Sequence, residues 1–136
     1  MDTGKSALGL DGNVAAALGY PIGIIAIISL IMEKENRFVK FHAIQSLLLY
    51  AAFIVIWVAV VVISFILVAI GIAASAAGGE AGGALGGIVG ILWWLVILVV
   101  FLAAFIGLIL AAVKAYQGEM YRLPILGNMA AKWAGV

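Results

Sequence analysis

The residues of this chain that could do chemistry gather in one short polar stretch, from Glu33 to Ser46. Within it, His42, Gln45 and Ser46 have the three- and four-residue spacing that places side chains on one face of a helix. A histidine, whose ordinary pKa is about 6.5, could exchange protons there, and its two neighbours could contact a polar substrate. The interpretation we favour is that all three side chains hydrogen-bond the loop before them, at a helix start that Asn36 could cap.

The inventory of reactive groups argues against an enzyme. The chain has one histidine and no cysteine, and no acidic residue lies inside its long apolar runs. A metal site needs several converging ligands, and a nucleophile needs a base beside it. We therefore expect no catalytic residue, no metal and no cofactor. The net charge of +1 gives no indication of a nucleic-acid partner.

The elements that must position this stretch are apolar helices. The chain is 68% apolar and only 10% charged, and residues 12–32, 41–79 and 81–113 are free of charge except for the histidine. About 20 apolar residues suffice to cross a bilayer as a helix. The sequence thus predicts an all-α polytopic membrane bundle forming a single domain over residues 1–136. Its expected spans are residues 14–32, 43–74 and 87–113, with a short amphipathic helix over 124–133.

Two segments leave alternatives open. Residues 73–90 are rich in glycine and alanine, and they could form a loop, a frayed helix end or a re-entrant segment. In the tail, Ile125, Met129 and Trp133 recur every four residues. This stripe could lie on the membrane surface or pack on the bundle, and the two readings have equal weight.

The basic residues predict an orientation. Three spans would place six of the seven basic residues on one side of the membrane, among them Lys34, Arg37, Lys40 and Arg122. Lys5 alone would lie on the other side. Because cytoplasmic loops carry the excess of Lys and Arg, we expect a multi-pass protein of a cell membrane with its N-terminus outside and its C-terminus in the cytoplasm. The same four side chains could contact anionic head groups.

Small residues recur along the expected spans at four-residue spacing, including Gly19 and Gly23 in the first and Gly107 and Ala111 in the last. Such positions let helix backbones approach closely in lipid. The spacing predicts tight packing, within one chain or between chains.

The motif Arg37-Phe-Val-Lys-Phe-His42-Ala-Ile-Gln45-Ser46, preceded by an acidic-basic-Asn segment, resembles a known family. It is similar to small uncharacterised prokaryotic membrane proteins grouped with the chloroplast inner-envelope protein-import component of about 20 kDa (Tic-type). The turn Tyr121-Arg-Leu-Pro124 also resembles the ending of that family. The resemblance implies a membrane protein without an assigned activity, related to a translocon subunit of four spans.

These observations favour a non-enzymatic membrane protein that acts through helix packing, as a homo-oligomer or with another membrane protein, in a lipid bilayer and without an identified small-molecule substrate. The alternative is a small oligomeric channel or transporter whose path is lined by His42, Gln45 and Ser46.

Overall fold

The computed structural model describes residues 3–136, and every regular element in them is a helix. In chain order these are α1 (Gly12–Leu18), α2 (Gly23–Met32), α3 (Arg37–Tyr116) and α4 (Leu126–Ala134). The contacts divide the chain into two compact units. The terminal unit comprises the chain up to Ala52 together with Phe105–Val136, and the central unit is Phe53–Ala104.

The expected span over residues 14–32 is two helices, α1 and α2, which contact each other. Pro21 lies in the break between them, where it supplies no backbone N–H to continue the helical ladder. With seven and ten residues, α1 and α2 extend about 10 and 15 Å, well short of a hydrocarbon core of about 30 Å. The single continuous span expected here is therefore corrected to a broken helical hairpin.

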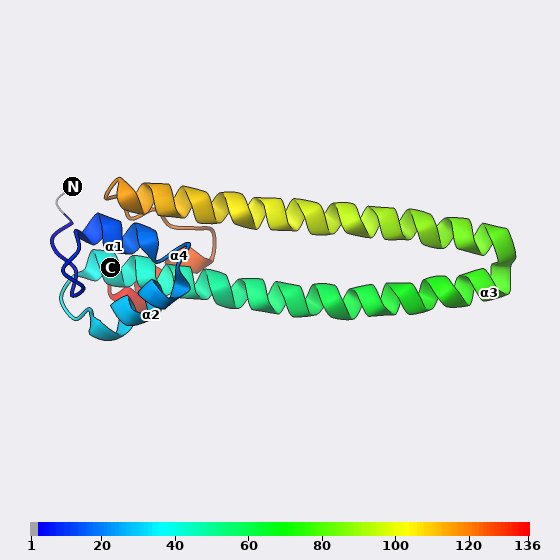
Figure 1. The fold of residues 1–136 in the computed structure, drawn as a ribbon, viewed down its shortest axis with the longest axis horizontal. Helices are drawn as coiled ribbons and strands as arrows, with labels where there is room; N and C mark the ends of the chain where they lie inside the picture. The colour runs from blue at the N-terminus through cyan, green and yellow to red at the C-terminus, as the bar shows by residue number, and fades with distance from the viewer. Residues whose placement is uncertain (1–2) are drawn as a thin grey trace. The chain divides into compact units, whose positions relative to one another are not determined.

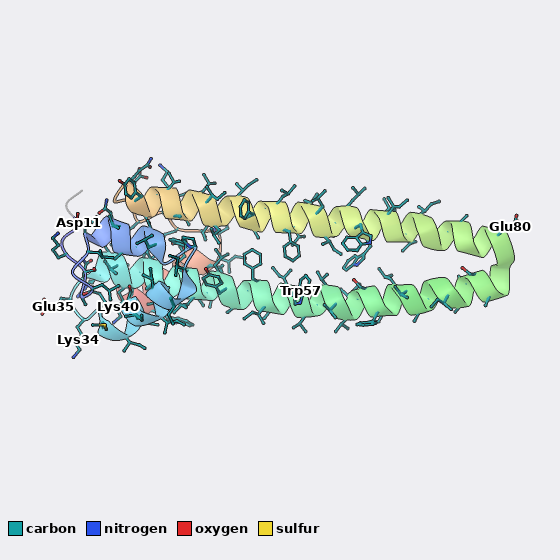
Figure 2. All side chains as sticks on the ribbon, in the orientation of Figure 1. Asp11, Lys34, Glu35, Lys40, Trp57 and Glu80 are labelled. Atoms are coloured by element: carbon teal, nitrogen blue, oxygen red, sulfur yellow. The ribbon has the colours of Figure 1, made fainter. Side chains whose placement is uncertain are left out.

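The other two expected spans, 43–74 and 87–113, are both parts of α3, which also contains the segment between them. Residues 73–90 are helical except at Gly79, whose φ of 56° and ψ of −135° turn the helix back on itself (Figure 1). Glycine adopts this positive φ without the penalty that a Cβ brings. Glu80 follows directly at the turn (Figure 2). Of the described helices, α3 is the one long and apolar enough to cross a membrane.

The central unit consists of the two stretches of α3 on either side of this turn. They meet where a Cβ built on Gly86 would lie 3.5 Å from the Cα atom of Gly71. Further along, the Trp93 indole donates a hydrogen bond of 2.9 Å to Ser64 Oγ. The Ser64 hydroxyl in turn donates to the carbonyl of Val60, so this polar pair is satisfied inside an apolar unit.

The core of the terminal unit lies between the start of α3 and α4. Phe41 and Ile44 of α3 pack against the buried alanines of α4, with Leu30 of α2 beside them. The tail helix expected over 124–133 is therefore present, and it packs through its small face (Ala130, Ala131, Ala134). The apolar stripe remains outside this contact, with Ile125 76% and Trp133 58% exposed.

Candidate functional site

The candidate site is the polar face of the first turns of α3. The helix begins after Asn36, whose side-chain oxygen accepts a hydrogen bond of 3.2 Å from the backbone N–H of Val39. This cap fixes the rotational setting of the helix, so that His42, Gln45 and Ser46 all point into the terminal unit. All three side chains are fully buried.

His42 joins α3 to two distant segments of the chain. Its Nε2 atom lies 3.0 Å from the backbone oxygen of Glu119, and its Nδ1 atom lies 2.9 Å from the hydroxyl of Tyr20. Because a carbonyl oxygen only accepts, Nε2 carries the proton and Nδ1 accepts from the Tyr20 hydroxyl. The rings of Phe38 and Phe41 pack edgewise on the imidazole, with centroids 4.7 and 4.9 Å away.

Gln45 uses both ends of its amide. Its nitrogen donates to the Tyr20 hydroxyl at 2.7 Å and to the backbone oxygen of Tyr121 at 3.0 Å. Its oxygen accepts from the backbone N–H of Leu123 at 3.1 Å. Gln45 thus satisfies two backbone groups of the irregular segment between α3 and α4, and Tyr20 links it to His42.

Ser46 and Tyr50 act on the break between α1 and α2. The Ser46 hydroxyl donates to the carbonyl of Gly19 at 2.6 Å, and the Tyr50 hydroxyl donates to the carbonyl of Tyr20. Both carbonyls lie at the end of α1, where no further helical turn follows to donate backbone N–H groups to them. Irregular backbone at membrane depth persists only where protein satisfies it, and these two side chains do so here.

The hydrogen-bond chain holds His42 in its neutral form. Protonation would place a second N–H against the Tyr20 hydroxyl, which already accepts from Gln45 and donates to Nδ1. The charged form would therefore lose one hydrogen bond as well as its hydration.

Taken together, this polar face fastens the interrupted segment Gly19–Ile22 and residues 117–123 to one helix. Its side chains are engaged with protein, and none of the three predicted residues presents a free polar group to solvent. The arrangement is that of backbone hydrogen bonding, the interpretation favoured above. The partners, however, lie in the break between α1 and α2 and in residues 117–123, and not in the loop before α3 that we expected.

A second polar cluster joins the N-terminal segment to both ends of α3. The backbone N–H of Ala7 donates to Glu33 Oε2 at 2.8 Å, and the Asn36 side chain donates to the carbonyl of Thr3 at 2.7 Å. The Asn13 side chain donates to the carbonyl of Tyr116 at 2.8 Å. Nothing in the spacing of these residues indicated the contacts, which span up to 103 positions of sequence.

The four predicted packing residues all serve contacts within the terminal unit. A Cβ on Gly19 would meet Ala26 of α2, and one on Gly23 would meet the ring of Tyr50 at 3.1 Å. Gly107 lies against Leu123, and Ala111 is fully buried.

The basic residues that we expected at head groups all belong to the terminal unit. Lys34, Arg37 and Arg122 are exposed and Lys40 is partly buried, and Arg37 donates to the carbonyl of Gly135. No group of three His, Cys, Asp or Glu side chains in residues 3–136 is placed to hold a metal ion.

Comparison with known proteins identifies the family. Residues 7–130 match the model of the magnetosome magnetite crystal formation protein family (MamF_MmsF). The chain belongs to this family. It is also 36% identical over 132 residues to a UPF0132 membrane protein of Methanocaldococcus jannaschii, covering 96% of each chain. A UPF0132 membrane protein of Archaeoglobus fulgidus is 37% identical over 124 residues, 90% of this chain and 95% of the relative.

These matches make the chain an all-α membrane protein of the uncharacterised UPF0132 family, for which the relatives' names give no activity. No solved structure matches the chain significantly.

Proposed function

We propose that this protein is a non-enzymatic membrane component that acts through helix packing, as a homo-oligomer or as a subunit of a membrane complex. The observation that carries the proposal is the position of the glycines in the central unit. Gly86 is used within the chain, against Gly71, whereas a Cβ on Gly87 or Gly90 would meet nothing within 4 Å.

Exposed apolar side chains alone do not require a protein partner, because lipid tails cover them equally well. An exposed glycine is different, since it offers lipid little surface but lets another helix backbone approach closely. Gly87 is exposed on α3, one turn before the large exposed side chain of Ile91, whereas Gly90 is partly buried and lines the space between the two stretches of α3 with Gly71. A second helix backbone could approach closely at Gly87.

The alternative of a small channel or transporter, related to the chloroplast import component, rests on the motif that contains His42, Gln45 and Ser46. A conducting path along these side chains would require them to leave the hydrogen bonds that hold Gly19–Ile22 and residues 117–123. We therefore favour packing. The family's description names magnetite crystal formation; on our proposal, this chain would serve such a process as a membrane component and not as a catalyst.

Chemical crosslinking in lipid vesicles over a range of protein-to-lipid ratios tests this proposal, with native mass spectrometry from nanodiscs as a second readout. We expect a discrete oligomer that Gly87→Ile weakens. Ala103→Ile is the matched control, because Ala103 is also exposed on the central unit and lies about 160° around the helix from Gly87. A monomer at every ratio, or equal weakening by both substitutions, would refute the proposal.

A further inference from the structure

We infer that the α1–α2 hairpin enters and leaves the membrane on one face, so that both termini lie in the cytoplasm and α3 crosses the bilayer twice. The first evidence is the pair of contacts that close the hairpin at its ends. Ala7 N donates to Glu33 Oε2, and the Asn36 side chain donates to the carbonyls of Thr3 and Lys5. Groups joined by hydrogen bonds lie on the same side of a bilayer, so residues 8–32 cross it an even number of times.

Neither helix of the hairpin is long enough to cross the membrane. α1 and α2 extend only about 10 and 15 Å, and the four residues between them include Pro21. Their free carbonyls are bound by Ser46 and Tyr50 of α3, so the break is satisfied by protein and can sit at membrane depth. Residues 8–32 are therefore a re-entrant segment, with no crossing.

The far end of α3 lies on the same side as its beginning. Asn13 donates to the carbonyl of Tyr116, the last residue of α3, and Asn36 at the first end contacts Thr3 and Lys5 of the same N-terminal segment. A chain that starts and ends on one side must turn on the other, and α3 turns at Gly79. The stretches before and after Gly79 measure about 63 and 56 Å along their helical path, so each is long enough to cross a core of about 30 Å.

The charges assign the sides. All seven Lys and Arg residues belong to the terminal unit, and the one charged residue of the central unit is Glu80 at the turn. Two crossings thus place every basic residue on one side and none on the other, which by the positive-inside rule is the cytoplasmic side. This arrangement keeps the expected cytoplasmic C-terminus and replaces the N-outside arrangement, which would separate Ala7 from Glu33 by the thickness of the bilayer.

The exposed face of α2 is then the surface that meets lipid. Ile24 and Ile31 are 61% and 72% exposed, Ile27, Ile28 and Met32 are exposed as well, and Lys34 follows them. An apolar helix face ending in a basic residue matches acyl chains below an anionic head-group layer. We assign the cytoplasmic leaflet as the occupant of this face.

Single-cysteine labelling tests the inference directly, since the chain has no cysteine of its own. Three exposed sites are suitable: Ala7→Cys before the hairpin, Glu35→Cys after it and Glu80→Cys at the turn of α3. Each variant is treated with a membrane-impermeant maleimide, in intact spheroplasts and after permeabilisation. Labelling in denaturant shows that each thiol is reactive.

We expect Glu80→Cys to react in intact spheroplasts, and Ala7→Cys and Glu35→Cys to react only after permeabilisation. Reaction of Ala7→Cys in intact spheroplasts, with Glu35→Cys protected, would overturn the re-entrant hairpin. Reaction of both in intact spheroplasts would overturn the cytoplasmic assignment. The contact of α2 with lipid is tested separately, with lipids brominated on their acyl chains. A fluorophore on Ile24→Cys should be quenched by these lipids, whereas one on Glu35→Cys, the control, should not be. Equally weak quenching at both positions would overturn the assignment of the α2 face to lipid.

Discussion

Replacing Gln45 by methionine should destabilise the terminal unit more than any other single change in the polar face of α3. Methionine matches the length of glutamine but cannot hydrogen-bond as an amide does. The substitution leaves the buried N–H of Leu123 without its acceptor and removes the donors to the Tyr121 carbonyl and the Tyr20 hydroxyl. Residues 117–123 would then be fastened to α3 mainly through His42 and the Glu119 carbonyl.

The magnitude follows from the three lost hydrogen bonds. A buried polar group left without a partner costs about 1–3 kcal/mol, and an ordinary hydrogen bond contributes about 0.5–1.5 kcal/mol net. Leu123 falls in the first class, and the Tyr20 hydroxyl, which keeps its bond to His42, falls in the second. We therefore expect Gln45→Met to lower the free energy of unfolding by about 2–5 kcal/mol.

Unfolding in mixed micelles of a mild detergent and dodecyl sulfate, followed by near-ultraviolet circular dichroism, measures this change. Gln117→Met is the matched control, because Gln117 is exposed and makes no side-chain hydrogen bond that the fold depends on. The control should stay within about 0.5 kcal/mol of wild type. A value for Gln45→Met as small as the control's would refute the view that this amide fastens the segment.

Two further predictions follow from the same geometry. Because protonated His42 would lose the hydrogen bond that it accepts from the Tyr20 hydroxyl, acidification should lower the free energy of unfolding, a dependence that His42→Gln should remove in the same unfolding assay. Gly79→Ala should destabilise the turn by about 1–3 kcal/mol, since alanine is strained at a φ of 56°. By contrast, Gly78→Ala, with open space at its Cβ, should leave thermal stability unchanged or raise it; equal effects at the two positions would contradict the assigned turn.

The sequence allowed several features of the fold to be predicted from local patterns. Charge-free runs identified the apolar lengths of α3, Asn36 as a possible cap indicated the helix start, and the tail after Pro124 predicted α4. The polar residues at 42, 45 and 46 were recognisable because their spacing places them on one helix face.

The break in the first expected span was harder to foresee, because hydropathy counts apolar residues and does not report whether they form one helix. Pro21 indicated a kink but not a full interruption. What makes the interruption stable lies elsewhere in the chain, in Ser46 and Tyr50. Likewise, the partners of His42 and Gln45 in residues 117–123 are 76 to 78 positions away, beyond the reach of any helical periodicity.

The orientation that we infer differs from the one expected from the sequence for the same reason. Counting basic residues gives a side only after the number of crossings is known, and that number depended on treating residues 14–32 as one span. With the hairpin closed by Glu33 and Asn36, the same rule places Lys5 with the other basic residues.

On the inferred topology, the N-terminal segment and both ends of α3 lie together on one face of the membrane. Asp11 and Gln117 line the same polar cavity, and both are exposed enough to carry a spin label. A pulsed electron–electron distance between labels on Asp11→Cys and Gln117→Cys in lipid nanodiscs tests this placement directly. We expect a short distance, well inside the hydrocarbon thickness of about 30 Å. A distribution centred at or beyond about 30 Å, as a spanning segment over residues 14–32 would give, contradicts it.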